Sequence, residues 1–538
     1  MHMLPPLRRL LRRPRAASRD RGPQRAFQPL SPSLQENLTY FKECLGGTED
    51  LTSREFRLGG GRGVKGALLY LKSITNCQIV NEQVLKPIFF GVSRQPWQPR
   101  DLLQFLEERV LAVEEIRRER DARVVLLHIT RGCAALFLEG AGEALICSVA
   151  GWEKRGISEP VAEGVVRGPR ESFIEDLSVN LSLIRRRLRT PALREETFLL
   201  GRYTQTRVAL VYIEGVAMDQ IVAEVRTRVS RIDVDGVIDT GVIEEFIEDC
   251  PWSPFAQVSY SERPDRVAAD LLEGRVAVFA DGSPVALLAP ALLVQFLQAA
   301  EDYYERYPIA AGIRILRFLA LLAMLSLPSA YVAVTTFHHE MLPARMLFNV
   351  LVTREGVPFP SLAEALLMEF VFEALREAGI RLPRPVGQAV SIVGGLVVGQ
   401  AAISAGLVSP LMVVVVALTG IASFVIPSYA MAITFRLLRF PVLILSGMLG
   451  FYGLMAGLMS ILIHLTTLRS FGIPYLAPLT PGVTRGLRDV FFRAPHWALD
   501  HRPAFVGKEN LVRQAPGQRP APQPLRPGRR GRRNARRR

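Results

Sequence analysis

The feature that most constrains this chain of 538 residues is a set of three long segments without Asp, Glu, Lys or Arg. These segments run from Phe318 to Phe337, from Pro385 to Phe435 and from Phe440 to Leu468, and the middle one is the longest. The hydrocarbon core of a bilayer requires about 20 apolar helical residues, and each of the three segments is at least that long. The second half of the chain is therefore predicted to be an all-α polytopic transmembrane domain, rather than a set of buried helices in a soluble protein.

The predicted membrane domain covers residues 309–470. The middle segment is long enough for two spans, and Gly406–Pro410 supplies a break between them. Four spans are predicted in total, near residues 318–337, 386–408, 411–434 and 440–466.

The arginines nearest these spans indicate their orientation. Arg314 and Arg317 precede the first span and several arginines follow the last one, which places both ends of the membrane domain in the cytoplasm. Four spans give the even number of crossings that this requires. Arg436 and Arg439 would then lie on the far side, which counts against the scheme, and a further crossing near residues 358–380 would reverse its parity.

That further segment, residues 360–379, reads as an amphipathic or re-entrant helix. It carries Glu364, Glu369 and Glu373 among Leu, Met, Phe and Val. Carboxylates at membrane depth are costly and often mark an ion route. The alternative is a surface helix whose acids lie in headgroup water.

The first 308 residues are predicted to be an α/β soluble region of two subdomains, residues 33–160 and 161–308, because charged residues recur throughout and a Gly/Pro-rich stretch separates the halves. Helices are predicted at 34–44, 76–89, 101–119, 173–188 and 218–229 and after Pro264. Strands are predicted at 64–71, 124–129, 134–138, 144–149, 208–213, 276–280 and 284–288.

Two Arg-rich arms, residues 1–32 and 513–538, are predicted to be disordered, and residues 471–512 form a cytoplasmic C-terminal segment between membrane and tail. Residues 1–25 hold eight arginines, and residues 513–538 hold ten and no acid. The arms either contact anionic lipid headgroups or a nucleic acid, or are solvated tails that help to fix the topology. The second alternative is favoured, and no nucleic-acid partner is expected. The first arm lacks the apolar core of a secretory signal, so the soluble region is predicted to stay on the cytoplasmic side.

No catalytic constellation is recognisable. Phosphate-binding loops, nucleophile elbows and paired-His motifs are missing from the sequence. His338-His339-Glu340 is the nearest approach to a ligand set, but adjacent histidines point in different directions on a helix, which favours a cap of the first span. We therefore expect neither an enzyme, nor a metal site, nor a cofactor.

Several phrases of the sequence resemble the A subunit of the GerA-type germinant receptors of bacterial spores. In order and spacing they are specific, and they extend over about residues 33–500. The phrases are Ser73-Ile74-Thr75-Asn76, Glu82-Gln83-Val84-Leu85-Lys86-Pro87, Asp233-Val234-Asp235-Gly236, Ser261-Glu262-Arg263-Pro264-Asp265, His338-His339-Glu340-Met341-Leu342-Pro343, Pro358-Phe359-Pro360, Leu366-Leu367-Met368-Glu369, Gly387-Gln388-Ala389-Val390-Ser391-Ile392-Val393-Gly394, Gly399-Gln400-Ala401-Ala402, Ser409-Pro410, Pro427-Ser428-Tyr429 and Phe471-Gly472-Ile473-Pro474-Tyr475.

The resemblance implies a subunit in the inner membrane of a spore, working beside a multi-span sensor subunit and a lipoprotein. It also implies a homo-oligomer that encloses a germinant-gated ion channel. The alternatives are a relative associated with the dipicolinate-release channel and a non-conducting scaffold subunit. A membrane enzyme and a transporter with inverted repeats are disfavoured, because neither a catalytic set nor a repeated half is visible in the membrane domain.

The predicted span 386–408 is rich in Gly and neutral polar residues. Such a helix either lines a pore with an apolar gate or packs closely against neighbouring helices. The candidate pore and gating residues are Gln388, Val390, Ser391, Val393, Val397 and Gln400.

A last motif, Glu262-Arg263-Pro264-Asp265, lies in the soluble region. Pro at a first helical position followed by Asp is ordinary capping chemistry. The resemblance instead favours a contact between subunits through these four residues.

Overall fold

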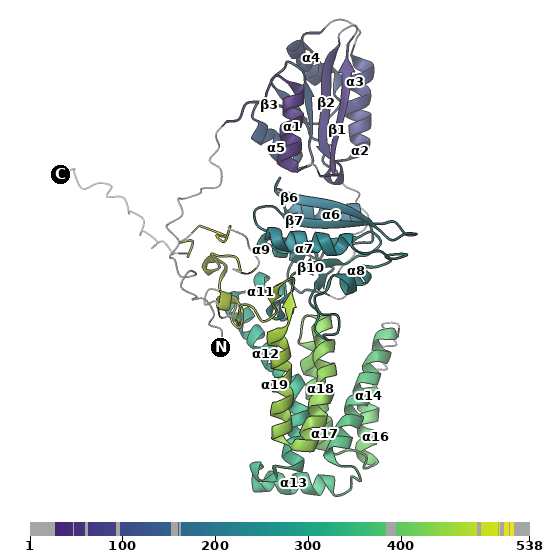
Figure 1. Cartoon of the computed structure of the whole chain (residues 1–538), viewed down its shortest axis with the longest axis vertical. Coiled ribbons are helices and arrows are strands. Elements are labelled where there is room, and N and C mark those ends of the chain that lie inside the picture. Colours follow the sequence, from purple (N-terminus) through teal and green to yellow (C-terminus); the bar gives the residue numbers. More distant parts are fainter. Residues whose placement is uncertain are drawn as a thin grey trace, which may run out of the picture. The chain divides into compact units, whose positions relative to one another are not determined.

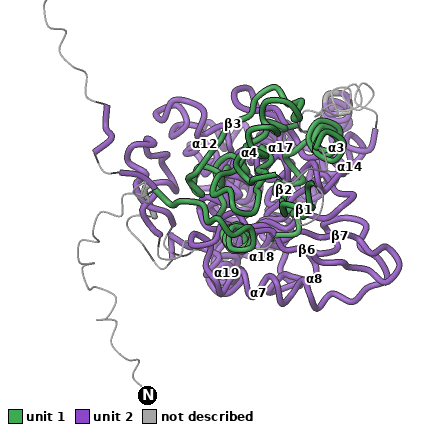
Figure 2. The backbone as a smooth tube through the Cα atoms, turned by 90° about the horizontal axis from the view of Figure 1, so that it is seen from above, with its two compact units in different colours: residues 1–153, 189–191 green, residues 154–188, 192–538 purple. Residues whose placement is uncertain are grey.

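The computed structural model describes residues 27–46, 48–59, 63–92, 97–151, 160, 163–382, 394–480, 482, 486–503, 505, 510–515 and 517–520. The chain divides into two compact units, one made of residues 1–153 with 189–191 and the other of residues 154–188 with 192–538 (Figure 2). Most of both predicted Arg-rich arms and residues 383–393 of the membrane region lie outside the described residues.

The first unit contains a three-layer α/β module, which we call repeat 1 (Figure 1). Its antiparallel sheet has the strand order β1-β2-β4-β5-β3. Helices α1 and α5 pack on one face, and the helices from α2 to η4 pack on the other. The elements are α1 (Leu34–Leu45), β1 (Leu51–Leu58), β2 (Val64–Leu71), α2 (Cys77–Ile79), η3 (Val80–Leu85), α3 (Lys86–Gly91), α4 (Pro99–Phe105), η4 (Leu106–Val110), β3 (Ile116–Glu119), α5 (Ala122–Ile129), β4 (Ala134–Leu138) and β5 (Ala144–Cys147).

The second unit begins with a module of the same kind, which we call repeat 2. Its antiparallel sheet has the order β6-β7-β9-β10-β8, with α6 and α9 on one face and α7 and α8 on the other. The elements are α6 (Leu177–Arg187), β6 (Leu193–Leu200), β7 (Thr206–Ile213), α7 (Asp219–Ser230), α8 (Thr240–Ile247), β8 (Ser259–Ser261), α9 (Pro264–Glu273), β9 (Val276–Ala280) and β10 (Ala286–Ala289).

One numerical offset relates the two repeats. Gly66 pairs with Leu138 across β2 and β4, and Val208 pairs with Ala280 across β7 and β9 (208 − 66 = 142). The same offset relates the other three strand pairings. It also relates three pairs of glycines with positive φ, at positions 59 and 201, 132 and 274, and 140 and 282. The two repeats are therefore two copies of one fold in one register.

The rest of the second unit is helical. Helix α12 packs against α14, α17, α18 and α19, and α14 also packs against α17 and α18 (Figure 1). The elements are α10 (Leu293–Phe296), α11 (Glu301–Tyr304), α12 (Tyr307–Thr336), η5 (His339–Met341), α13 (Ala344–Arg354), α14 (Ser361–Arg381), η6 (Gly394–Val398), α16 (Gly399–Ser404), α17 (Pro410–Phe424), α18 (Tyr429–Leu449) and α19 (Phe451–Thr467). Among the described residues, α12 and α18 are long and apolar enough to cross a membrane, and α17 and α19 are shorter apolar helices.

Two predictions for the α/β region are wrong. Residues 124–129 form part of helix α5 and not a strand, because Asp121 caps a helix there by accepting from the backbone N–H of Arg123. An apolar run of this length fits either structure. The predicted helix 101–119 ends at Val110, and its last residues form the edge strand β3. Strands β1, β6 and β8 were not predicted.

The membrane region also differs from the prediction. Residues 318–337 lie almost wholly in the longer helix α12, which starts at Tyr307. The predicted spans 411–434 and 440–466 correspond to three helices, because the chain breaks after Phe424 and again at Gly450, whose φ is 62°. Arg436 and Arg439 therefore lie within α18 and not in a loop between spans.

Candidate functional site

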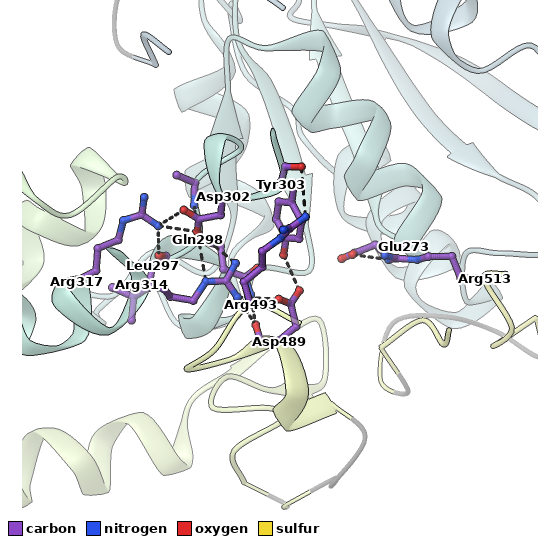
Figure 3. Close-up of polar contacts among 11 residues, drawn as sticks. Glu273, Leu297, Gln298, Asp302, Tyr303, Arg314, Arg317, Asp489, Arg493 and Arg513 are labelled. Atoms are coloured by element: carbon purple, nitrogen blue, oxygen red, sulfur yellow. Dashed lines mark hydrogen bonds and ion pairs between the residues drawn. The ribbon is translucent and has the colours of Figure 1, made fainter. Parts of the chain in front are cut away.

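Two buried arginines of α12 are held by acidic groups where repeat 2 meets the helices (Figure 3). The guanidinium of Arg314 donates to Asp302 at 3.2 Å and to Oδ1 of Asp489 at 2.8 Å. Arg317 donates to both carboxylate oxygens of Asp302, at 2.6 and 2.8 Å. Arg314 is 0% exposed and Asp302 is 2% exposed, so the ion pairs of Asp302 are shielded from water, whereas the side chain of Asp489 is 23% exposed. We call Asp302, Tyr303, Arg314, Arg317 and Asp489 the junction cluster.

The C-terminal segment supplies one acid of this cluster. Asp489 ends the short helix η7 (Gly486–Asp489), and its backbone carbonyl accepts from Gln298 and Arg314, each at 2.7 Å. The hydroxyl of Tyr303 donates to its Oδ2 at 2.7 Å. Burial raises the pKa of the Tyr303 hydroxyl and of the Asp489 carboxyl, and Arg314 opposes the shift of the Asp489 pKa. The segment is thus clamped to the start of α12.

A second contact joins repeat 2 to the helices through the docking loop, residues 253–255. Phe255 is buried, and its ring centroid lies 5.5 Å from that of Phe435 in α18 and 5.9 Å from that of His464 in α19. The carbonyl before it accepts from the hydroxyl of Thr434 at 2.6 Å. Phe255 belongs to the core cluster of the helices. A displacement of repeat 2 would therefore act directly on α18 and α19.

Two acids of α14 face two arginines of α18. Glu369 and Arg439 form an ion pair in which the side chains are 0% and 1% exposed. One turn along each helix, Glu373 and Arg436 approach to 3.4 Å. Glu369 and Glu373 are four positions apart and lie on one face of α14, and Arg436 and Arg439 are three positions apart and lie on one face of α18. The later acid pairs with the earlier arginine, so the two helices run antiparallel.

The third predicted acid, Glu364, is also buried and partnered. Its Oε1 lies 3.3 Å from Arg354 of α13, and its Oε2 accepts from the backbone N–H and the hydroxyl of Ser409 at 3.1 and 3.0 Å. We call these three acids and their arginines the charge ladder. Ion pairing of this kind is how charged side chains are accommodated among membrane helices. Removal of one member of a buried pair costs about 3–5 kcal/mol, because the other charge is left unpaired.

Four of the predicted pore residues, Gln388, Val390, Ser391 and Val393, lie outside the described residues. Val397 in η6 and Gln400 in α16 are described, and both are exposed in the single chain. Their side chains are thus available to a pore, to lipid or to a neighbouring subunit, and their role stays a prediction.

The predicted subunit-contact residues lie at the start of α9. Arg263 is 1% exposed and donates to the carbonyls of Glu163 and Pro169, each at 3.0 Å, and to Asp265 at 2.8 Å. Pro264 is buried and Glu262 is half-buried. Arg263 thus holds the segment before repeat 2 within its own chain, and a contact with another subunit through these residues stays a prediction.

His338 and His339 do not converge on a ligand set. The Nδ1 atom of His338 lies 3.3 Å from the carbonyl of Ala333, and its ring packs against Phe451 at a centroid distance of 5.0 Å. Among the described residues there is no group of three His, Cys, Asp or Glu side chains that could hold a metal ion.

Sequence reasoning missed the junction cluster and the docking loop. Asp302 and Asp489 lie far apart along the chain, one before α12 and the other after α19, and nothing in the local sequence indicates that they share Arg314. A signal was present in Arg314 and Arg317, because two arginines one helical turn apart on a long apolar helix need acidic partners if they are buried. Phe255 carried no comparable signal.

Comparisons with known proteins find a matching family model and several similar proteins. A family model described as "Bacillus/Clostridium GerA spore germination protein" matches residues 39–505. Spore germination protein KA of Bacillus subtilis (strain 168) is 45% identical over 92% of this chain and 90% of its own length. The uncharacterized membrane protein YfkQ of the same strain is 42% identical over 90% of this chain and 93% of its own. Spore germination protein GerLA of Bacillus cereus is 37% identical over 90% and 98%.

A solved structure is also similar. It is the crystal structure of the N-terminal domain of the A subunit of the Bacillus megaterium spore germinant receptor GerK3. The match has 31% sequence identity and a TM-score of 0.41, and it covers 51% of this chain and all of that chain.

Proposed function

Because this chain belongs to the GerA spore germination protein family, we propose that it is a membrane subunit of a nutrient germinant receptor that helps to trigger spore germination. The printed names of several relatives, which are spore germination proteins, support this role. The family relation also agrees with the expectation that the chain is not an enzyme.

The proposed location is the inner membrane of the spore. The long apolar helices α12 and α18 support a membrane domain, together with the shorter helices α17 and α19. The paired acids and arginines of the charge ladder support it too, since isolated charges at such depth would be costly. The α/β repeats would then lie on the cytoplasmic side.

The proposed mechanism is a germinant-gated ion channel formed by several copies of this subunit, beside a multi-span sensor subunit and a lipoprotein. The observation that carries it is the packing of repeat 2 and the helices into one core through Phe255 and the junction cluster. A rearrangement of the α/β repeats, driven by a partner subunit, would move α12 and α18 as rigid bodies. Exposed Val397 is the described candidate for an apolar gate.

Ion flux tests this proposal. The complete receptor would be reconstituted in liposomes with its sensor and lipoprotein subunits, and flux would be recorded with and without germinant. Val397→Ala should raise basal flux, because a smaller side chain widens and wets an apolar constriction. Val414 in α17 has the same exposure, 54%, so Val414→Ala is the matched control and should leave flux unchanged. Assembled receptors that never conduct, although germination in spores depends on the chain, would show that the subunit is a scaffold.

A further inference from the structure

A cavity of about 310 Å³ lies beside the junction cluster, inside the second unit. Its walls come from three parts of the chain: the end of α9, the segment from β10 to α11, and the C-terminal segment after α19. This size is at the lower end of small-molecule binding pockets. Figure 3 shows the cluster and the ion pair of Glu273 with Arg513 on either side of this region.

Most of the cavity surface is apolar. Leu292 and Val294 are buried side chains of the segment after β10, and Val490, Leu499 and Phe505 approach from the C-terminal segment. Such walls exclude water and favour an apolar body in a bound molecule.

Among the residues that the structure describes, the charged groups of the cavity leave a positive charge without a carboxylate partner. Glu273 pairs with Arg513 and lies 3.8 Å from Arg275, and Asp489 pairs with Arg314. Both acids are thus neutralised. Arg502, by contrast, donates only to oxygens of the backbone and of an amide, at 2.7 to 3.1 Å, and no carboxylate of the described residues lies within 4 Å of it.

One further polar group is unsatisfied. Gln295 lines the cavity and is 5% exposed, and its amide nitrogen donates to Ser259 and Asp270. Its Oε1 atom is buried without a hydrogen-bond partner among the described residues. A buried acceptor left in this way costs about 1–3 kcal/mol. The atom has almost no accessible surface, so a bound molecule would reach it only after the side chain had turned.

We propose that this cavity binds a small, largely apolar molecule with one anionic group, and that Arg502 pairs with the anion. A planar guanidinium is well suited to a carboxylate. A cationic molecule would instead face three arginines whose nearby acids are already paired.

The cavity shares residues with the junction cluster. Tyr303 and Asp489 line it and also hold Arg314 of α12. A bound molecule would therefore press the C-terminal segment against repeat 2 and strengthen the clamp on α12. Binding itself does not depend on the proposed receptor function, so the two can fail independently.

Three probes of nearly equal size test the charge preference: benzoate, benzamide and benzylamine. Their binding to the full chain in detergent micelles would be measured by saturation-transfer NMR and calorimetry. We expect benzoate to bind about tenfold more tightly than benzamide, and benzylamine to bind most weakly, since one charged hydrogen bond is worth about this factor. Arg502→Gln should lower the ratio of benzoate affinity to benzamide affinity from about ten to about one. The ratio is compared because Arg502 also donates to Leu272, Asn510 and Val512, so its loss can weaken the binding of both probes.

Two controls make the result decisive. Arg207→Gln removes an exposed arginine elsewhere in repeat 2, so it should leave all three affinities unchanged. Val294→Phe and Leu499→Phe fill the cavity from opposite walls, and both should abolish binding of every probe. Equal affinities for benzoate and benzamide, a preference that survives Arg502→Gln, or no binding at millimolar probe would each overturn the proposal.

Discussion

Repeat 1 and repeat 2 have the same strand order, the same register and the same helices, but they differ at three equivalent positions that decide what each repeat can do. The offset in residue number that relates the two sheets places Val113 opposite Phe255, Asp121 opposite Arg263 and Leu102 opposite Glu244. In repeat 1 these positions hold a partly buried core residue, a helix cap and a fully buried leucine.

In repeat 2 the side chains at the same positions make different contacts, while the strands keep their register. Phe255 enters the core of the helices, and Arg263 holds the segment that precedes the repeat. Glu244 places a carboxyl where the frame provides a largely apolar site. The comparison teaches that contact with the helices from α12 to α19 needs few changes in a repeat, because the sheet and the helices on its two faces are a complete fold in both repeats.

The largest expected effect comes from the docking loop. Phe255→Ala should destabilise the chain by about 4 kcal/mol, since it removes a buried aromatic ring from a core shared by repeat 2, α18 and α19. Val113→Ala at the equivalent position of repeat 1 should cost about 1 kcal/mol. Denaturant unfolding in micelles, with hydrogen exchange to locate the loss, measures both. If Phe255→Ala and Val113→Ala lower the free energy of unfolding by similar amounts, the docking loop contributes only local packing.

The next effect concerns the residue before the last helix of each repeat. Arg263→Ala should cost about 3 kcal/mol, because it leaves two carbonyls without their donor and removes the positive charge beside Asp265, which keeps the hydroxyl of Tyr304 as a donor. Asp121→Ala at the equivalent position removes only a helix cap and should cost about 1 kcal/mol. Hydrogen exchange in β9 and β4 compares the two repeats. A cost for Arg263→Ala no greater than that of Asp121→Ala would place Arg263 among ordinary capping residues.

Much of this fold was visible in the sequence. The strand 276–280 was predicted at its observed bounds, and the alternation of strands and helices indicated an α/β class. The duplication was also readable, since Gln78-Ile79-Val80 and Gln220-Ile221-Val222 are identical and stand at the same offset as the strands (220 − 78 = 142). A prediction made element by element does not show this duplication, because it depends on comparing positions 142 residues apart.

The site was less predictable. The acids of α14 were recognised as costly, but their partners Arg436 and Arg439 were placed in a loop, since periodicity alone does not say that α18 runs through two arginines. The junction cluster depends on tertiary contacts between Asp302, Arg314 and Asp489, which have no local pattern. Spatial pairing of distant charges is the step that a single sequence does not provide.

The third prediction uses the half-buried carboxyl of Glu244. Burial raises the pKa of Glu244 from 4.5 to about 7, and Glu248, Asp239 and Glu245 add to the shift. The folded state thus holds the proton more tightly than the unfolded state. Stability is unaffected below about pH 4.5, falls as the pH rises to about 7, and is then lower by up to about 3 kcal/mol.

Replacing this residue by its counterpart from repeat 1 sharpens the test. Glu244→Leu, which restores the equivalent of Leu102, should stabilise the chain at pH 8 by about 2 kcal/mol more than at pH 4. Glu245 is exposed on the same helix, so Glu245→Leu is the control and should show little difference between the two pH values. If the difference between the pH values is the same for both variants, Glu244 titrates normally.

The smallest expected effect tests the equivalence itself. Gly140 and Gly282 occupy matching turns with φ of 82° and 88°, a region that costs an L-residue about 1 kcal/mol, so both alanine variants should be destabilised by about that amount. A Cβ at Gly140 would lie 3.2 Å from Pro99, whereas at Gly282 the nearest atom is 3.9 Å away, so Gly140→Ala should cost slightly more.

Gly241→Ala, in the first turn of α8 where φ is negative and the Cβ meets nothing closer than 3.4 Å, is the control and should be neutral or stabilising. Unfolding free energies of the three variants decide the matter. If Gly282→Ala is neutral while Gly140→Ala is destabilising, the turn of repeat 2 accepts an L-residue that the turn of repeat 1 does not accept, and the two turns are not equivalent.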